Sequence, residues 1–333
     1  MAGRIFVEIV LKTTFVSVIV QNEMKNVRRF IMAEILMKAA SFVAIIFMGY
    51  LLRKRGFFKE EDFHVLSKIV LKITLPAAIV SNFSGADVNA SLLILSVLGL
   101  GGGLILMAFS YLAAGKDREE KAFFMLNTSG YNIGNFTMPF AQSFLGPAGV
   151  ITTSLFDTGN AFICLGGAYS AAKMVKGGEG KISLMPILKT LVRSVPFDAY
   201  VLMTVLSLLH LSLPAPVTTF SGIIAGANAF MAMLMMGVGF KISGDTSQKG
   251  KIVKILAVRY SISIAVAAAL YFLMPLPLEY RQALAILPLS PIASAAPAFT
   301  ADMKSDFGLA SAVNSISIVI SIVLITATLL AIL

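Results

Sequence analysis

Polar side chains with a regular spacing interrupt an otherwise apolar stretch between Asn127 and Asn160. Asn132 and Asn135 are three residues apart, so on a helix both amides share a face, and Pro139 then interrupts the backbone hydrogen bonds. A helix broken inside a membrane exposes N–H groups with a partial positive charge, which attract an anion. The pattern therefore predicts an anion site to which the two amides add neutral donors. The alternative is that the amides only satisfy carbonyls freed by the proline.

The same spacing recurs at Asp157 and Asn160 in the next apolar segment. Asp157 is the one acidic residue well inside a predicted span, and polar groups in lipid are costly unless they have a role. We consider Asp157 and Asn160 candidates for proton or ion coupling. The alternative is that Asp157 is a structural acceptor, bonded to Asn160 or to the broken backbone of the preceding segment.

A second proline-rich segment near the C-terminus repeats this arrangement. Pro297 there corresponds to Pro139 in the first half, and each proline is followed by a glycine and then by a polar group inside the next segment. In the second half that polar group is Asn314. We therefore expect Pro297 and Asn314 to form the counterpart of the first cluster.

The composition is that of a membrane protein. Hydrophobic residues make up 57% of the 333 residues and charged residues only 13%, and the mean hydropathy is +0.87. A soluble domain carries about 25% charged residues. The net charge of +10 does not indicate nucleic acid, because the basic residues lie in short loops between apolar runs. The single cysteine, Cys164, excludes an internal disulfide and a cysteine metal cluster, and we expect no metal and no cofactor.

The hydropathy pattern predicts an all-α membrane protein with ten transmembrane helices. The predicted spans are 35–52, 63–83, 92–114, 122–145, 148–172, 196–212, 216–240, 252–274, 282–301 and 307–332. No Walker sequence, paired zinc ligands or serine nucleophile elbow is present, so ATP-driven pumping and an enzymatic function are unsupported.

Residues 1–33 are treated as an N-terminal extension and not as a span. Its apolar part, from Ile5 to Val20, is short for a membrane crossing and contains charged residues. We expect either an interfacial helix or a later start of the chain, at Met24 or Met32.

The loop charges predict the orientation of the chain. Alternate loops contain at least fifteen basic residues, whereas the opposite set contains only Arg281. The fifteen are Arg53, Lys54, Arg55, Lys59, Lys116, Arg118, Lys121, Lys173, Lys176, Lys181, Lys241, Lys249, Lys251, Lys254 and Lys304. We expect this set to be cytoplasmic in a multi-pass protein of the cytoplasmic membrane, with both ends of the ten-span bundle outside.

The cytoplasmic connection 173–195 divides the chain into a first half, 34–172, and a second half, 196–333. Each half has five predicted spans, and an odd number reverses the orientation of the second half. The sequence thus predicts two inverted five-helix repeats in which helices four and nine are broken by prolines. Interrupted segments at corresponding positions of two inverted halves indicate the binding site of a transporter.

Four stretches together resemble the auxin efflux carrier family of membrane transporters. They are N-x-x-N-F-T-M-P-F at 132–140, D-T-G-N at 157–160, L-P-A-A-I-V at 75–80 and A-P-A-F-T-A-D-M at 296–303. Each motif alone is loose, but their order across ten spans makes the set specific. The resemblance covers residues 35–333.

This resemblance implies that broken helices four and nine cross near the membrane centre. Spans one, two, six and seven would form a scaffold that dimerises, and spans three to five and eight to ten a transport domain that moves against it like an elevator. Members of the family carry small organic anions, including auxin in plants and dicarboxylates in some bacteria. We expect a small carboxylate to bind at Asn132, Asn135, Thr137, Pro139, Pro297 and Asn314.

Two alternatives stay open at this stage. One is a sodium-coupled organic anion symporter of the related bile acid type. Span nine has Ser290, Ser294 and Thr300 but no glutamate or glutamine, and this departure counts against sodium coupling. The other is a membrane sensor that binds an anion without moving it. A weaker site candidate is Lys72 in span two, which either attracts the anion or extends its ammonium group to the cytoplasmic surface.

Overall fold

The computed structural model describes residues 2–84, 88–177, 184–241 and 248–333, and the side chains of the first helix from residue 29 onward. Parts of three predicted loops, 85–87, 178–183 with Lys181, and 242–247, lie outside the described residues. Where it is described, the chain is helical, and its one β-type pairing is an isolated antiparallel bridge between Tyr131 and Ile292. The all-α prediction is therefore confirmed for the described residues.

Seven helices in the described part of the chain are long and apolar enough to cross a membrane. They are Arg29–Lys54, Asp62–Phe83, Ala90–Ala113, Gly146–Lys176, Ala215–Gly239, Lys249–Leu273 and Phe307–Ile332. An eighth span results if α9 (Leu184–Leu191) and α10 (Val195–Leu208), bent by 77°, count as one. The prediction of a multi-pass membrane protein is confirmed, and these helices cover eight of the ten predicted spans.

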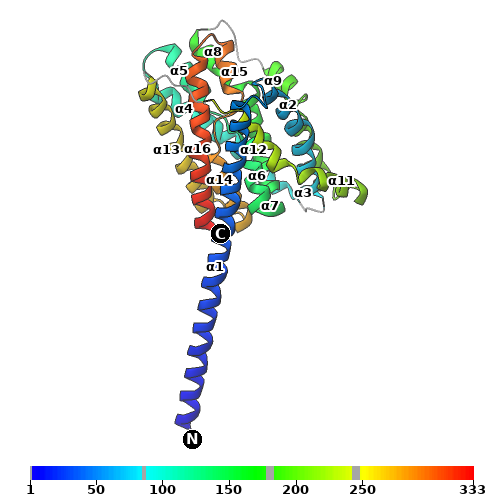
Figure 1. The fold of residues 1–333 in the computed structure, drawn as a ribbon, viewed down its shortest axis with the longest axis vertical. Coiled ribbons are helices and arrows are strands. Elements are labelled where there is room, and N and C mark those ends of the chain that lie inside the picture. The colour runs from blue at the N-terminus through cyan, green and yellow to red at the C-terminus, as the bar shows by residue number, and fades with distance from the viewer. Residues whose placement is uncertain (1, 85–87, 178–183, 242–247) are drawn as a thin grey trace.

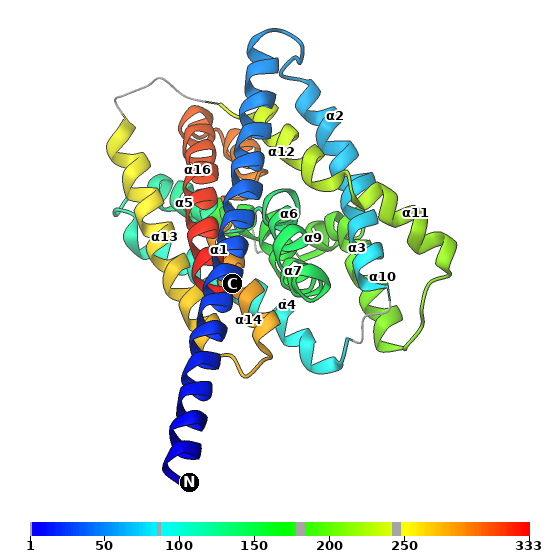
Figure 2. The same cartoon turned by 60° about the horizontal axis from the view of Figure 1, so that its bottom comes forward.

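The other two predicted spans, 122–145 and 282–301, are each broken into short helices. The first contains α5 (Arg118–Thr128), η3 (Ile133–Thr137) and α6 (Met138–Phe144). The second contains α14 (Leu278–Ile286), η6 (Leu287–Leu289) and α15 (Ala296–Asp302). Figure 2 shows α6 in the middle of the bundle, between α13 and α16 on one side and α2, α3 and α11 on the other.

The predicted position of the first break was wrong. The helix does not break at Pro139 but at residues 129–132, where Gly130 has a φ of +80° that glycine adopts without strain. Pro139 lies in the first turn of α6, directly after the π-type turn η3. A first-turn position tolerates proline because its missing N–H is not needed there. In the second segment Pro297 likewise lies in the first turn of a short helix, α15.

The first helix, α1 (Ala2–Lys54), runs without a break through both the N-terminal extension and the first predicted span. Figure 1 shows its N-terminal half projecting away from the other helices. Its C-terminal half packs closely on α12 (Asn228–Gly239), where a Cβ atom added to Gly237 would lie 2.0 Å from the Ile46 carbonyl oxygen. Small residues thus let these two backbones touch.

A second close pair is formed by α4 (Ile94–Ala113) and α7 (Gly146–Phe162). A Cβ atom at Gly159 would lie 1.8 Å from the Ser96 carbonyl oxygen, and one at Gly99 would lie 1.9 Å from the Phe156 carbonyl oxygen. The Ser96 hydroxyl also donates to the Leu155 carbonyl oxygen at 2.8 Å. This contact fixes the position of α7 along α4, and with it the positions of Asp157 and Asn160 on α7.

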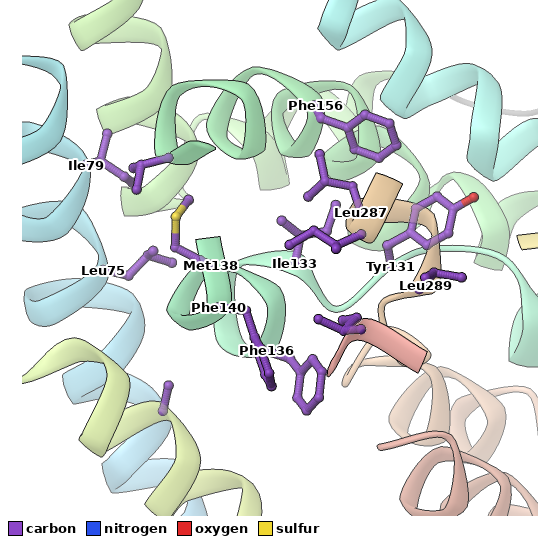
Figure 3. Close-up of a cluster of buried hydrophobic side chains, with 14 of the residues drawn as sticks. Leu75, Ile79, Tyr131, Ile133, Phe136, Met138, Phe140, Phe156, Leu287 and Leu289 are labelled. Carbon is purple, nitrogen blue, oxygen red and sulfur yellow. The ribbon is translucent and has the colours of Figure 1, made fainter. Parts of the chain in front are cut away.

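Buried apolar side chains surround the two broken segments. Figure 3 shows Ile133 from the first segment beside Leu287 from the second, and Phe136, Phe140 and Leu289 belong to the same buried cluster. The ring of Phe140 also meets that of Phe42 on α1 edge to face, with centroids 4.9 Å apart. The breaks therefore lie inside the protein core and not at the lipid surface, as irregular backbone at membrane depth requires.

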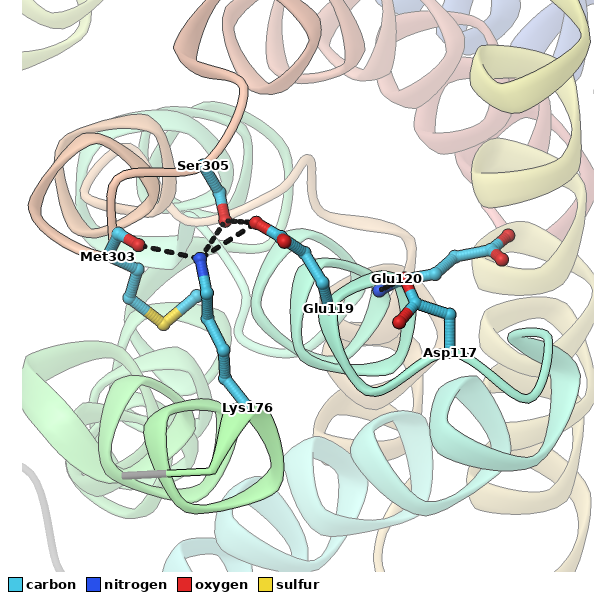
Figure 4. Close-up of polar contacts among 6 residues, drawn as sticks. All are labelled: Asp117, Glu119, Glu120, Lys176, Met303 and Ser305. Carbon is cyan, nitrogen blue, oxygen red and sulfur yellow. Dashed lines mark hydrogen bonds and ion pairs between the residues drawn. The ribbon is translucent and has the colours of Figure 1, made fainter. Parts of the chain in front are cut away.

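Ion pairs connect the predicted cytoplasmic loops at one end of the bundle. The Lys176 ammonium lies 2.7 Å from a Glu119 carboxylate oxygen and donates to the Met303 carbonyl at 2.9 Å and the Ser305 hydroxyl at 3.1 Å (Figure 4). Two further pairs, Lys241 with Glu60 and Lys254 with Glu120, join the remaining loops. These contacts agree with the predicted placement of the basic loops on one side of the membrane.

The Lys176 cluster predicts a small pH-dependent contribution to stability. The hydrogen bond that Glu119 accepts from Lys176 is the largest cause of a lowered pKa of the Glu119 carboxyl group, and the bond from Ser305 is the second. A lowered pKa contributes stability above the unfolded-state pKa of about 4.3, and this is lost as the pH falls through the folded-state value. We expect Glu119→Gln to cost at most about 1 kcal/mol at neutral pH, because the pair is exposed.

Thermal unfolding of Glu119→Gln and the wild type, followed from pH 7 down to about pH 3, tests this expectation. The difference between them should shrink as the pH falls. Glu61→Gln, at an exposed glutamate of the same end, is the control. A difference that stays constant with pH would contradict the expected role of the Glu119 charge.

Candidate functional site

The two broken helices meet at their breaks. Tyr131 and Ile292 form the antiparallel bridge, and the Asn132 N–H donates to the Pro291 carbonyl oxygen at 2.9 Å. The two extended stretches thus pair like two very short strands. Main-chain atoms thus form one part of the contact between the two broken helices.

The Asn160 side chain completes the backbone of the first break. Its Oδ1 accepts from the Tyr131 N–H at 3.0 Å, and its Nδ2 donates to the Tyr131 carbonyl oxygen at 2.8 Å. Nδ2 also lies 2.8 Å from Asp157 Oδ1. A buried N–H and C=O that have lost their helical partners are therefore satisfied by one amide.

Polar groups of α16 (Phe307–Ile332) serve the second break in a similar way. Asn314 Nδ2 donates to the carbonyl oxygens of Ile292 and Ala293, both at 3.2 Å. The Ser317 hydroxyl accepts from the Ile292 N–H at 3.1 Å. Each break is thus held by the long helix that follows it in the sequence.

Asp157 lies on α7, and its carboxylate is close to Gly134, where the first broken segment becomes helical again after the break. The carboxylate accepts hydrogen bonds from the Asn160 amide at 2.8 Å and from the Tyr200 hydroxyl at 3.0 Å. A carboxylate of the protein therefore already lies beside this helix start, which is predicted to attract an external anion. The structural contacts expected for Asp157 are present.

The other residues of the first motif differ in their surroundings. Asn132 Nδ2 lies 3.9 Å from Met236 Sδ, and Asn135 Oδ1 is buried with no hydrogen-bond partner among the described residues. The Thr137 hydroxyl is fully buried and lies 2.5 Å from the Ser290 hydroxyl, so it joins the two broken segments. Asn135 therefore retains an unused acceptor at the crossing.

Two cavities flank the crossing. The first, about 220 Å³, is lined by Asn132, Asn135, Asp157, Asn160, Tyr200 and Ser294, among others. The second, about 310 Å³, is lined by Arg53, His64, Lys241, Ser294, Pro297 and Asn314, among others. The predicted site residues therefore divide between two cavities, and Ser294 contributes to both. Thr137 and Pro139 line neither of these two cavities.

Each cavity lies between two groups of helices. On one side of the first cavity are η1 (Val70–Thr74), α3 (Leu75–Phe83) and α10, and on the other are the breaks and α7. The second lies between α1, α2 (Asp62–Ile69) and α12 on one side and α15 and α16 on the other. The family resemblance predicts a scaffold and a transport domain made of these two groups of helices, and this division stays a prediction.

Lys72 lies in η1 with an exposed side chain and lines neither cavity. This position does not support contact of Lys72 with an anion at the crossing. It fits the alternative, in which the lysine extends its ammonium group to the membrane surface.

Arg259 is a residue of the crossing that the sequence analysis missed. It lies on α13 (Lys249–Leu273), is fully buried, and its guanidinium group donates to backbone carbonyls at both breaks. Between residues 255 and 274 it is the only charged residue. A single charge inside a predicted span was the available signal.

These features define a multi-pass helical membrane protein whose cavities lie beside two discontinuous, crossing helices. The chain belongs to the Membrane transport protein family, whose sequence profile matches residues 34–332. The resemblance to the auxin efflux carriers is thereby confirmed.

A relative from Methanothermobacter thermautotrophicus (strain Delta H), described as an uncharacterized transporter, is 26% identical over 206 residues. The match covers 60% of this chain and 65% of the relative, just under two thirds of the latter's length.

Proposed function

We propose that the protein is a secondary transporter or facilitator of small organic anions, carboxylates in particular, which works by alternating access. The observation that carries the proposal is the crossing of two broken helices with a cavity on each side. In transporters, discontinuous helices at corresponding positions of two repeats form the substrate and ion sites. Membership of a membrane transport family supports transport as the activity.

The first cavity is the proposed substrate site. Its volume of about 220 Å³ suits a small molecule, and the amides of Asn132 and Asn135 lie at its wall. The second cavity carries Arg53, His64 and Lys241 and would raise the local concentration of anions near the crossing. Its one acidic lining residue, Glu60, is paired with Lys241.

Asp157 is proposed to couple a proton to the substrate. An anion in the first cavity lies close to the Asp157 carboxylate, and two like charges at short range repel each other strongly in a site of low dielectric constant. A proton on Asp157 removes that repulsion. Its bond from Tyr200 on α10 also joins the two helix groups, so the charge of Asp157 bears on their relative movement.

The proposed movement carries α4–α8 and α13–α16 past α1–α3 and α10–α12, as in an elevator. Side-chain bonds between the two groups, which this movement would break, include Tyr200 with Asp157 at 3.0 Å, the Lys241 N–H with the Ser315 hydroxyl at 3.1 Å and the Gln142 amide with the Ala225 carbonyl at 3.1 Å. Both cavities include residues near the basic end, Ser194 in the first and Arg53 in the second. This conformation is proposed to be the inward-facing one.

Reconstitution of the purified protein tests the proposal. Proteoliposomes screened with mono- and dicarboxylates on supported membranes should give saturable currents or uptake. Saturable binding without transport would favour the sensor, and a strict requirement for sodium would favour a bile-acid-type symporter. No response to any carboxylate would contradict the proposed substrate class.

Asn135→Ala is expected to weaken carboxylate binding at least about tenfold, since it removes a charge-assisted hydrogen bond of about 1.5–3 kcal/mol. The fold should persist, because Asn135 Oδ1 has no partner among the described residues that would be lost. Binding by isothermal calorimetry and the melting temperature together test this. Lys72→Ala, outside both cavities, is the control. Unchanged affinity in the Asn135 variant would place the substrate elsewhere.

Asp157→Asn is expected to remove the pH dependence of transport while some transport remains, because asparagine cannot exchange a proton. Uptake measured with and without an imposed proton gradient tests this. Tyr200→Phe is a matched control, since it deletes the hydroxyl donor but keeps the carboxylate, and its pH dependence should persist. A pH profile unaltered by Asp157→Asn would leave Asp157 as a structural acceptor only.

A further inference from the structure

Arg259 binds both breaks at once. Its Nη1 donates to the carbonyl oxygen of Thr128, and its Nη2 donates to those of Ser290 and Pro291 at 2.8 and 3.1 Å. The side chain is fully buried, and its guanidinium carbon lies 5.4 Å from the centre of the Tyr131 ring. One cation thus contacts three main-chain oxygens from two segments more than 150 residues apart in the sequence.

These oxygens lie at negative helix ends. Thr128 is the last residue of α5, and Ser290 directly follows η6. The last carbonyls of a helix lack intrahelical partners and carry a partial negative charge. No carboxylate among the described residues forms an ion pair with Arg259, so carbonyl dipoles and the Tyr131 ring balance its charge.

This set of ligands is the kind that binds an alkali cation. In transporters with discontinuous helices, unwound backbone carbonyls and half-helix C-terminal ends coordinate sodium. A guanidinium group is larger and planar, but it offers the same positive charge to the same type of oxygen, with directed donors. The Arg259 Nε–H has no partner among the described residues, which indicates that the terminal nitrogens determine its position.

We propose that Arg259 is a resident cation of the crossing and occupies what is otherwise a monovalent cation site. Together with Asp157 it neutralises the crossing from within: Asp157 lies beside Gly134 at the start of η3, and Arg259 donates to the carbonyls at the ends of α5 and η6. The crossing therefore needs no sodium for its cohesion. Removal of the Arg259 side chain opens a site for a small cation.

This inference stands on the crossing itself and is tested without a substrate. The full-length protein is purified in detergent, heated, and assayed by size-exclusion chromatography for the fraction that stays monodisperse. Wild type, Arg259→Ala, Arg259→Lys and Arg259→Gln are compared in sodium chloride, in choline chloride at equal concentration, and in choline chloride with millimolar guanidinium. Arg53→Ala is the matched control, because Arg53 also donates to two backbone carbonyls, those of Val238 and Phe240, but is only half-buried.

The wild type should melt at the same temperature in sodium and choline. Arg259→Ala should melt about 6 to 20 °C lower in choline, as expected for the loss of one member of a buried charged network. Guanidinium, and to a smaller extent sodium, should recover at least half of that shift, whereas Arg53→Ala should not respond to either ion.

Two results would overturn the proposal. One is a wild type stabilised by sodium relative to choline, which would show a cation site that Arg259 does not fill. The other is an Arg259→Ala variant that responds to neither ion. If Arg259→Ala does not fold, the Arg259→Lys and Arg259→Gln variants are compared with each other. The Lys variant, which keeps the positive charge, should melt at a clearly higher temperature in choline chloride than the Gln variant. Equal melting temperatures would contradict a role for the charge.

Discussion

Gly99→Ala is expected to prevent stable folding, whereas Gly101→Ala, two residues further along the same helix, is expected to leave the protein intact. A Cβ atom at Gly99 would lie 1.9 Å from the Phe156 carbonyl oxygen and 3.2 Å from the Asn160 nitrogen. Both are backbone atoms, so α4 and α7 must separate along their whole contact. Overpacking of this kind costs about 1–3 kcal/mol when side chains can adjust, and more here because they cannot.

The Gly101 position is the matched control, because a Cβ atom there meets no atom within 4 Å. Both substitutions replace glycine by alanine within α4, so both gain the same helix propensity, about 1 kcal/mol. The yield of monodisperse protein and its melting temperature measure the difference. Equal behaviour of the two variants would contradict the close packing of α4 on α7.

Asn160→Leu is expected to destabilise the crossing and abolish transport. Leucine has a similar size but offers no hydrogen bond, so the N–H and C=O of Tyr131 lose their partner inside the core. Each buried, unsatisfied backbone group costs about 1–3 kcal/mol. Asp157 loses a donor as well, which alters the proposed coupling site even in molecules that fold.

Asn82→Leu is the control for this substitution. Asn82 is partly buried, but within the described parts of the chain its amide donates only to the Ala78 carbonyl of its own helix, at 2.7 Å. That variant should keep nearly normal stability and transport. Melting temperature and uptake in proteoliposomes are the measurements, and an Asn160→Leu protein with wild-type stability would show that the Tyr131 backbone finds other partners.

Hydropathy alone predicted most of the helices because each long span has to bury an apolar stretch of membrane length. The bent pair α9–α10 and the broken segments were harder to place, since their pieces are too short to register as spans. The inverted repeat stays a prediction. The similar way in which Asn160 and Asn314 hold the two breaks agrees with it.

The sequence indicated the neighbourhood of the site but not its details. Proline was taken as the break itself, yet Pro139 is accommodated by the turn before it, and the break occurs at Gly130. Because only four residues separate Arg259 from Lys254, its charge is easily attributed to the basic N-terminal end of the predicted span 252–274. Its partners are backbone carbonyls, which every residue has, so no residue type in the sequence could indicate where they lie.

The joint between the two broken helices has a consequence for how substrates can change over time. The Asn132 N–H bond to Pro291 and the Tyr131–Ile292 bridge use main-chain atoms only. Residues such as Ser294 and Asn135 can therefore be exchanged without rebuilding the frame that holds them. One architecture can in this way acquire new cargo through a few substitutions at the cavity walls, while the joint itself stays the same.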